Sequence, residues 1–138
     1  MNGILIVNKP KDFTSRDVVN KISHIFKIKK IGHTGTLDPI ATGVLVICIG
    51  NTTKLCEILT SEYKEYIATI KLGIKTDTLD ITGNIIETKP FDITETQIKE
   101  VLSSFLGESI QETPIYSAVK VNGKKLYEYA RVGKKIEL

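Results

Sequence analysis

The stretch from Gly32 to Gly50, GHTGTLDPIATGVLVICIG, joins a loop to a strand, and the other elements can be placed around it. Its second part, Gly43–Gly50, is an apolar run rich in β-branched residues and bounded by glycines, which predicts a buried strand. Its first part, Gly32–Pro39, is too rich in glycine and proline for regular structure and predicts a loop. We therefore expect an internal strand whose preceding loop can present polar side chains.

The segments before this stretch predict a strand followed by a helix. Gly3–Val7 is apolar and predicts a buried strand. Thr14, with Asp17 three residues later, is typical of a capping box that opens a helix. The apolar stripe of that helix has three- and four-residue spacing and consists of Val18, Val19, Ile22, Ile25 and Phe26.

The segments after this stretch continue the mixed pattern. A short helix is predicted from Thr52 or Thr53, with Leu55, Ile58 and Leu59 facing inward. It is followed by a strand at Lys64–Leu72, a polar loop at Gly73–Gly83 and a short strand at Asn84–Glu87. A second capping box, Thr94 with Gln97, then predicts a helix, and a strand at Tyr116–Val121 runs into the hairpin signal Asn122-Gly123. This order indicates one domain of the α+β or mixed α/β class.

The chain of 138 residues carries a net charge of +3, and that charge is distributed unevenly. Residues 1–35 hold seven Lys or Arg against two Asp or Glu, and residues 113–138 hold six against two. Residues 36–112 hold six against twelve. Two basic ends around an acidic middle would suit a polyanion held from two sides. The alternative is that runs such as Lys27, Lys29 and Lys30 are a solvated surface.

Several classes of protein are disfavoured. No apolar run approaches the roughly 18 residues of a membrane span, and the N-terminus lacks a signal-peptide pattern, so we expect a cytoplasmic protein without a membrane partner. Cys48 and Cys56 make no disulfide framework, and Cys48 is expected to be a small buried hydrophobe. With His24 and His33 as the only histidines, we expect no metal site, and no phosphate-binding glycine loop or other cofactor motif is present.

The loop at Gly32–Pro39 contains the residues most suited to chemistry. Asp38 before Pro39 can be a helix N-cap with proline at the first helical position. An aspartate on a rigid glycine- and proline-containing turn is also suited to be a nucleophile or a general base. His33 has the same two interpretations, as a surface or capping residue or as a functional one.

These residues resemble a known family. Gly32–Leu45 is similar to the signature of the TruB family of tRNA pseudouridine synthases. Other segments resemble the family's motifs in the same order: Gly3–Leu5 with Asn8-Lys9-Pro10, Lys64-Glu65-Tyr66, Leu72-Gly73 with Thr76–Asp80 and Gly83, Tyr116–Lys120, and Gly123–Arg131. The resemblance therefore extends along the whole chain. It implies an α+β fold with a mixed, mainly antiparallel sheet and packed helices, here an incomplete pseudouridine synthase catalytic domain.

The resemblance implies that the substrate is the T-loop uridine of tRNA (position 55), isomerised to pseudouridine without a metal, an organic cofactor or a guide RNA. Asp38 would be the catalytic aspartate, and the sugar carbon, the pyrimidine ring and a proton all remain open as its target. Tyr66 would stack on the flipped-out uracil and assist the proton step. His33 would fill the gap that the extruded base leaves in the RNA.

The other site residues are also implied by the resemblance. The residues expected to bind RNA are His33, Lys9, Lys64, Lys120, Lys124, Lys125 and Arg131. Those expected to support the active site are Pro10, Gly32, Gly35, Thr36, Leu37 and Pro39, and Lys9 with Pro10 would support its floor. Residues near 116–131 would form a mobile basic segment that closes over the RNA.

Residues 1–138 are expected to be the N-terminal portion of the catalytic domain. In the family, an arginine from a later Gly-Thr-Tyr-[Ile/Leu]-Arg motif pairs with the aspartate, and neither that motif nor a PUA-type domain is found in these residues. The alternative to an enzyme is therefore a catalytically incomplete fragment that binds RNA or assists tRNA folding.

Overall fold

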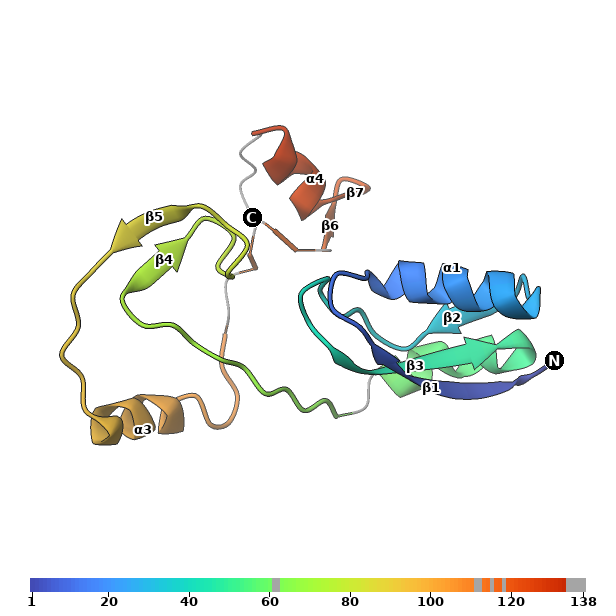
Figure 1. Cartoon of the computed structure of the whole chain (residues 1–138), viewed down its shortest axis with the longest axis horizontal. Coiled ribbons are helices and arrows are strands. Elements are labelled where there is room, and N and C mark those ends of the chain that lie inside the picture. Colours follow the sequence, from blue (N-terminus) through green and yellow to red (C-terminus); the bar gives the residue numbers. More distant parts are fainter. Residues whose placement is uncertain (61–62, 111–112, 115, 118, 134–138) are drawn as a thin grey trace. The chain divides into compact units, whose positions relative to one another are not determined.

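The computed structural model describes residues 1–60, 63–110, 113–114, 116–117 and 119–133, which belong to two compact units. The first unit, Met1–Ile67, contains β1 (Gly3–Lys9), α1 (Ser15–Phe26), β2 (Ile31–His33), β3 (Gly43–Ile49), the 3₁₀-helix η1 (Gly50–Leu55) and α2 (Cys56–Thr60) (Figure 1). The second unit, Ala68–Leu138, contains β4 (Ile74–Thr76), β5 (Ile85–Thr88), α3 (Glu95–Ser103), β6 (Lys120–Val121), β7 (Lys124–Lys125) and α4 (Leu126–Arg131). This mixture of helices and small antiparallel sheets confirms the α+β class.

The first unit is built on a three-stranded antiparallel sheet in the order β1-β3-β2. The strand predicted at Gly43–Gly50 is confirmed as β3, which is central in the sheet and pairs along its whole length with β1, from Gly3 opposite Ile49 to Lys9 opposite Gly43. The prediction of an irregular loop is wrong at Gly32 and His33, because Ile31–His33 pair with the end of β3. Three residues are too few to show a strand periodicity, so only the pairing partner makes them a strand.

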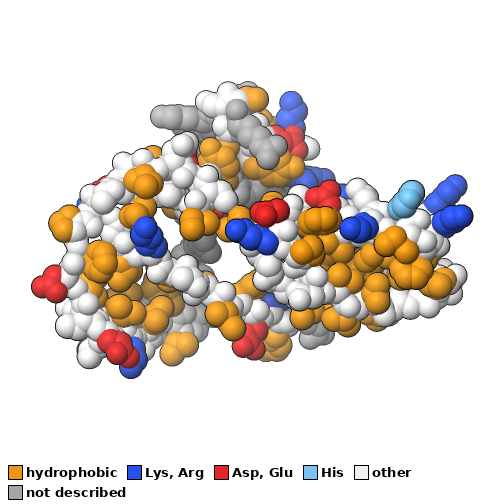
Figure 2. All heavy atoms as spheres, viewed as in Figure 1, with side chains coloured by type: hydrophobic (Ala, Val, Ile, Leu, Met, Phe, Trp, Pro, Cys, Tyr) orange, Lys and Arg blue, Asp and Glu red, His pale blue; other side chains and the backbone are white. Residues whose placement is uncertain are grey.

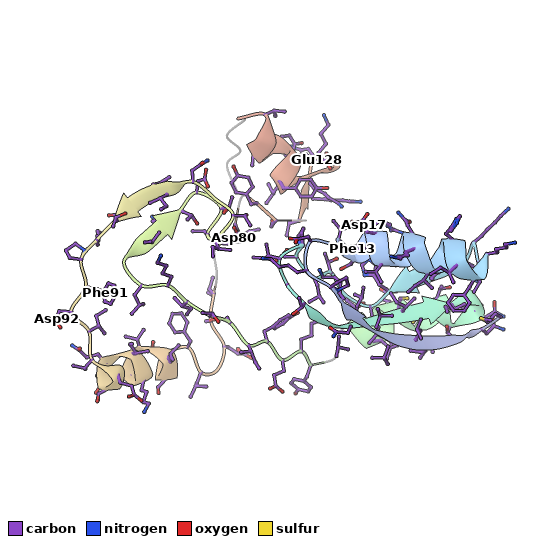
Figure 3. All side chains as sticks on the ribbon, viewed as in Figure 1. Phe13, Asp17, Asp80, Phe91, Asp92 and Glu128 are labelled. Carbon is purple, nitrogen blue, oxygen red and sulfur yellow. The ribbon has the colours of Figure 1, made fainter. Side chains whose placement is uncertain are left out.

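Helix α1 packs on this sheet and forms the core with it. The predicted capping box is confirmed: the Asp17 N–H donates to Thr14 Oγ1 at 3.0 Å, and the Thr14 N–H donates to Asp17 Oδ2 at 2.9 Å (Figure 3). The buried core consists of Val18, Val19, Ile22, Leu45, Ile47 and Ile49. Ile25 and Phe26 were expected in the same stripe, but they lie in the last turn of α1 and stay exposed.

The helical segment after β3 differs from its prediction. It begins as a 3₁₀-helix at Gly50, where φ is +66°, rather than at Thr52 or Thr53. The Thr52 hydroxyl donates to the Gly3 carbonyl at 2.6 Å and so ties this segment to β1. Leu55 and Ile58, expected inward, are exposed, and Leu59 is half-buried. A segment of eleven residues split between two helix types cannot keep the 3.6-residue period that the prediction assumed.

A hydrogen-bonded turn connects β4 to β5 in the second unit. The predicted loop at Gly73–Gly83 contains β4, which pairs with β5. In the turn, Asp80 (Figure 3) accepts at Oδ1 from the Thr82 hydroxyl at 2.6 Å, the Thr78 hydroxyl at 2.8 Å and the Thr82 N–H at 2.8 Å. These bonds, the Thr82 hydroxyl first, hold the Asp80 pKa below its usual value. A Cβ on Gly83 would collide with Thr78 Oγ1 and Asp77 Oδ1. The polar side chains of Thr76–Asp80, the segment that resembles a family motif, thus form hydrogen bonds within the turn.

The rest of the second unit forms local elements. Helix α3 has the predicted capping box of Thr94 and Gln97, but its apolar side chains are largely exposed (Figure 2). The Asn122-Gly123 hairpin is confirmed between β6 and β7, with φ of +51° and +80°, as a type I′ turn requires. The predicted strand at Tyr116–Val121 is shorter, and its Ala118 lies outside the described residues.

The strand predicted at Lys64–Leu72 is wrong, since residues 63–71 form no helix or paired strand. Alternating apolar side chains suit a strand only where a second strand supplies hydrogen bonds.

Within the described part of the chain, no helix has both the length and the apolar character that a membrane span requires.

Candidate functional site: the Asp38 loop and a basic pocket

A buried lysine fastens the loop that carries Asp38. Lys9, at the end of β1, is fully buried. Its ammonium donates to the carbonyls of Pro10 at 2.9 Å, Phe13 at 2.6 Å and Pro39 at 3.3 Å. An ammonium has three donors, so these three acceptors satisfy it without a carboxylate. Lys9 therefore joins the start of the chain to the Asp38 loop, and its expected contact with RNA stays a prediction.

Two further contacts hold the loop on either side of Asp38. The Asp12 N–H donates to the Pro39 carbonyl at 2.8 Å. The Leu37 N–H donates to Ser15 Oγ at 2.9 Å, and the Ser15 hydroxyl is within 3.3 Å of the Leu37 carbonyl. Because both neighbours of Asp38 are anchored by the region around the start of α1, the backbone at Asp38 is held in place.

The Asp38 side chain itself is exposed. The Ala41 N–H donates to the Asp38 carbonyl at 3.0 Å, which closes a turn, and residues 39–42 form no helix. The interpretation of Asp38 as a helix N-cap is therefore wrong. Across the described residues, the Asp38 carboxylate has no ion pair. An anchored loop with an exposed carboxylate can present that group to a molecule from solution.

The predicted supporting residues lie on this loop or beside it. Leu37 is half-buried and packs against the core, whereas Thr36 and Pro39 are exposed. Pro10 is exposed and contributes its carbonyl to Lys9. A Cβ placed on Gly35 would make an ordinary van der Waals contact with the Lys64 side chain, at 3.7 Å.

The two predicted site residues after α2 are placed differently. Lys64 lies beside the loop at Gly35, and its ammonium also donates to the Thr60 carbonyl. Tyr66 is largely exposed in the segment 63–71. The structure thus brings Lys64 to the Asp38 loop, while no interaction joins Tyr66 to Asp38 within the described residues.

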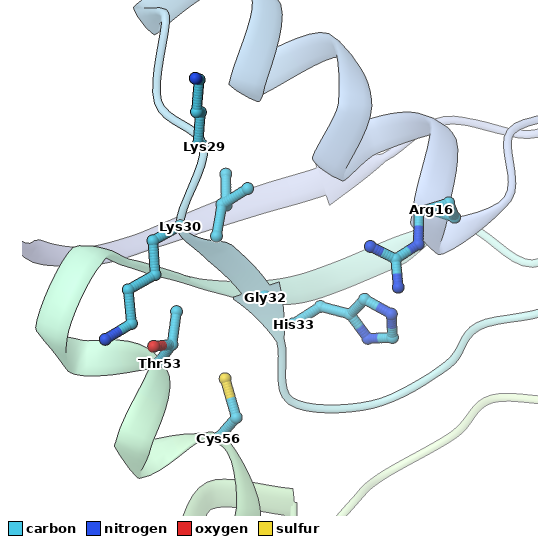
Figure 4. A pocket seen from close by; sticks show the side chains of 8 residues that line it. Arg16, Lys29, Lys30, Gly32, His33, Thr53 and Cys56 are labelled. Atoms are coloured by element: carbon cyan, nitrogen blue, oxygen red, sulfur yellow. The ribbon is translucent and has the colours of Figure 1, made fainter.

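His33 lies in a shallow basic pocket of the first unit with a volume of about 510 Å³ (Figure 4). The residues that line it are Arg16, Lys29, Lys30, Ile31, Gly32, His33, Thr53 and Cys56, and none of them is acidic. His33 Nδ1 is buried and has no hydrogen-bond partner in the described part of the chain. The pocket therefore combines three cationic side chains with an unsatisfied ring nitrogen, an arrangement that suits an anion.

Sequence reasoning missed most of this basic pocket. Lys29 and Lys30 were considered as a basic run but assigned no site, and Arg16, Thr53 and Cys56 were not singled out as site residues. The available signal was the charge of residues 1–35, with seven basic residues against two acidic ones. Only the pairing of β2 with β3 places Lys29 and Lys30 opposite η1 and α2.

The predicted RNA-binding residues of the second unit cluster at the hairpin. Lys120 is paired with Lys125, and Lys124 with Val121. Lys120 and Lys124 are exposed, and the Lys125 ammonium lies 5.4 Å from the centre of the Tyr127 ring. Arg131 ends α4, and its side chain lies outside the described part. Among the described residues, no group of three or more His, Cys, Asp or Glu could hold a metal ion.

Comparison with protein families identifies the chain. A model described as "TruB family pseudouridylate synthase (N terminal domain)" matches residues 23–138. The chain belongs to the TruB family. Its Asp38 loop therefore lies within the matched region, as do both basic segments after residue 23, Lys27–Lys30 and Lys120–Lys125.

Two relatives show how much of a TruB-family protein this chain represents. The tRNA pseudouridine synthase B of Bacillus subtilis (strain 168) is 53% identical over 99% of this chain and 45% of that protein. The tRNA pseudouridine synthase B of Clostridium novyi (strain NT) is 55% identical over 99% of this chain and 47% of that protein. The chain thus spans about half the length of the relatives it matches.

Two solved structures have a similar fold. The crystal structure of a Cbf5-Nop10-Gar1 complex contains a chain that matches with a TM-score of 0.59 and 28% identity, over 86% of this chain and 31% of that chain. The structure of an H/ACA RNP bound to a substrate RNA containing 2′-deoxyuridine matches with a TM-score of 0.54 and 26% identity, over 79% of this chain and 29% of that chain. The fold is therefore an incomplete α+β pseudouridine synthase fold.

Proposed function

We propose that this chain is the N-terminal portion of the catalytic domain of a cytoplasmic tRNA pseudouridine synthase that converts the T-loop uridine (position 55) to pseudouridine, with Asp38 as its nucleophile. The observation that carries the proposal is the identity of 53–55% over nearly the whole chain to bacterial tRNA pseudouridine synthase B proteins. The anchoring of the Asp38 loop by Lys9, Asp12 and Ser15 supports it, because a nucleophile needs a fixed position.

The reaction needs no atom from outside the substrate except protons. The bond between the sugar C1′ and N1 of uracil breaks, a bond between C1′ and C5 forms, N1 gains a proton and C5 loses one. Asp38 provides the nucleophile for this rearrangement, and Tyr66 stacks on the flipped uracil and assists the proton step. Flipping is required because the target atoms are shielded within the stacked loop.

The basic pocket is proposed to hold RNA phosphates. Arg16, Lys29 and Lys30 supply positive charge, and His33 lies on β2, at the start of the loop that carries Asp38. A phosphate held there would position the RNA, while His33 occupies the place of the extruded base. The hairpin lysines 120, 124 and 125 supply further phosphate contacts, as the exposure of Lys120 and Lys124 supports.

We propose that the enzyme acts on the T stem-loop without a guide RNA. Support comes from the difference in identity, which is 53–55% to proteins named tRNA pseudouridine synthase B and 26–28% to chains of the Cbf5-Nop10-Gar1 and H/ACA RNP structures. An isolated T stem-loop RNA should therefore be a sufficient substrate.

The direct test is Asp38→Asn in a protein extended to the full length of the relatives. The assay follows tritium released from uridine labelled at C5 of a T stem-loop RNA, since the reaction removes that hydrogen. We expect no release by the variant and normal binding of the RNA. Asp12→Asn is the matched control, because Asp12 lies beside the same loop at a φ of +66° that asparagine tolerates. Turnover by Asp38→Asn at the wild-type rate would refute Asp38 as nucleophile.

The alternative, a fragment that binds RNA without turnover, is favoured by the chain covering only 45% of the Bacillus subtilis relative. The same RNA is given to the 138-residue chain and to the extended protein. Binding by both with tritium release by the extended protein alone would support the fragment interpretation of this chain. Release by the short chain would reject it.

A further inference from the structure

The first unit brings its two cysteines together. Cys48 on β3 lies directly opposite Gly32 on β2, so their Cα–Cβ directions point to the same face of the sheet. A Cβ placed on Gly32 would lie 3.2 Å from Cys56 Sγ. The sulfur of Cys56 therefore occupies the space beside Cys48 that a larger residue at position 32 would fill.

The two thiols have different surroundings. Cys48 is fully buried, as the sequence predicts, whereas Cys56 is half-buried and lines the basic pocket. Burial raises the pKa of the Cys48 thiol to about 11, and the neighbouring Cys56 thiol adds to the rise. Cys48 therefore stays protonated near neutral pH, and Cys56 is the sulfur of the pair that a molecule in the pocket can reach.

We propose that Cys48 and Cys56 form an oxidative modification site at which a peroxide converts the thiol pair to a reversible disulfide. In the first step Cys56 sulfur attacks a peroxide oxygen, the O–O bond breaks, and for hydrogen peroxide one water leaves as Cys56 becomes a sulfenic acid. In the second step Cys48 sulfur attacks the Cys56 sulfur, the S–O bond breaks, and a second water leaves with the Cys48 proton. A dithiol reductant reverses the modification. This inference does not depend on the proposed function.

The test treats the reduced, folded 138-residue chain with hydrogen peroxide, then unfolds it in urea and measures the intact mass and the number of thiols that iodoacetamide alkylates. We expect a monomer that has lost two hydrogen atoms and both reactive thiols, and that regains both with dithiothreitol. Accumulation of Cys56 sulfinic acid while Cys48 remains a free thiol would overturn the proposal. So would disulfide-linked dimers as the main product.

Single variants separate the roles of the two sulfurs. Cys48→Ala should stop at a Cys56 sulfenic acid, which dimedone traps. Cys56→Ser should leave Cys48 a free thiol under the same treatment. A Cys56→Ser chain whose Cys48 is oxidised as fast as in the wild type would overturn the assignment of Cys56 as the entry point. Far-ultraviolet circular dichroism of each variant confirms that the comparison is made on folded protein.

A glycine pair tests the geometry without touching either sulfur. Gly32→Ala places a methyl group 3.2 Å from Cys56 Sγ, so this sulfur must shift and disulfide formation should slow. Gly3→Ala is the matched control, because a Cβ there has no atom within 4 Å. Equal rates of disulfide formation in native chain and in chain unfolded by urea would also contradict the proposal, since the native fold would then not be what brings the thiols together.

Discussion

The two units of this chain use their apolar residues in opposite ways. In the first unit a helix covers a three-stranded sheet, and the residues buried between them include Val19, Leu45 and Ile47. In the second unit, Leu126 is the buried large hydrophobic residue among those described, and α3 exposes Val101 and Leu102. Each of its two-stranded ladders and short helices offers too little surface to enclose a core. Similar numbers of apolar residues therefore do not make equal cores.

Local hydrogen bonds take the place of a core in the second unit. Thr94 and Gln97 cap α3 reciprocally, and Asp77 and Asp80 accept hydrogen bonds within the turn between β4 and β5. The first unit combines such caps with burial. We therefore expect the free energy of unfolding to respond strongly to core substitutions in the first unit and to turn and cap substitutions in the second.

The largest contrast is expected between Ile47→Ala and Leu102→Ala. Ile47 is fully buried, so its truncation leaves a cavity and lowers the free energy of unfolding by about 3 kcal/mol. Leu102 is 54% exposed, so the same kind of truncation costs under about 1 kcal/mol. Urea unfolding followed by circular dichroism measures both. Similar losses at the two positions would break the comparison between the units.

The second effect concerns the buried ammonium of Lys9. Lys9→Met keeps the length of the side chain but leaves the carbonyls of Pro10, Phe13 and Pro39 without their donor. We expect a loss of about 2 kcal/mol in the free energy of unfolding, because unsatisfied buried acceptors are costly. Lys11→Met, at an exposed position nearby, is the control and should change little. An unchanged urea midpoint in Lys9→Met would show that the loop does not need this anchor.

The third effect is local to the second unit. In Gly83→Ala, the new methyl group collides with Thr78 Oγ1 and Asp77 Oδ1, so the turn must open at a cost of about 1–3 kcal/mol. The Asn84 N–H donates to Asp77 Oδ1, and its hydrogen exchange should therefore accelerate. Amides of β3 serve as the internal reference. Acceleration throughout β3 as well would show that the two units unfold together.

The fourth effect asks whether both units contact RNA. Lys30→Gln removes a cation from the basic pocket, and Lys124→Gln removes one from the hairpin. Each should weaken binding of a T stem-loop and reduce the slope of log affinity against log salt by about 1. Lys99→Gln on α3 is the control and should leave the slope unchanged. A normal slope in Lys124→Gln would confine RNA binding to the first unit.

The smallest effect is a pH dependence of the turn that contains Asp80. Its hydrogen bonds, the Thr82 hydroxyl first, lower the Asp80 pKa below 3.8 in the folded state. A lowered pKa means that the stabilisation is present at neutral pH and is lost as the pH falls through the folded-state value. The Thr82 amide shift, followed by nuclear magnetic resonance between neutral and acidic pH, should titrate below pH 3.8 in the wild type. In Asp80→Asn that titration should disappear.

Elements with local signals were predictable from the sequence. Both capping boxes depend on residues three positions apart, and the Asn122-Gly123 turn depends on two adjacent residues that accept a positive φ. Elements that depend on a distant partner were not. Ile31–His33 became a strand because β3 lies beside it, and Lys64–Leu72 did not, because alternation alone supplies no hydrogen bonds.

The sequence by itself determined the family and the strand at Gly43–Ile49, because both depend on patterns within contiguous residues. Only the tertiary structure decided that Lys9 anchors the Asp38 loop, that Lys29 and Lys30 share a pocket with His33, and that Cys56 Sγ lies beside Gly32, the residue paired with Cys48. The Lys9–Pro39 contact joins residues that the chain separates, and the pocket joins residues of α1, β2, η1 and α2. The free energy of each tertiary contact depends on burial and on the distance between atoms, and a sequence pattern specifies neither.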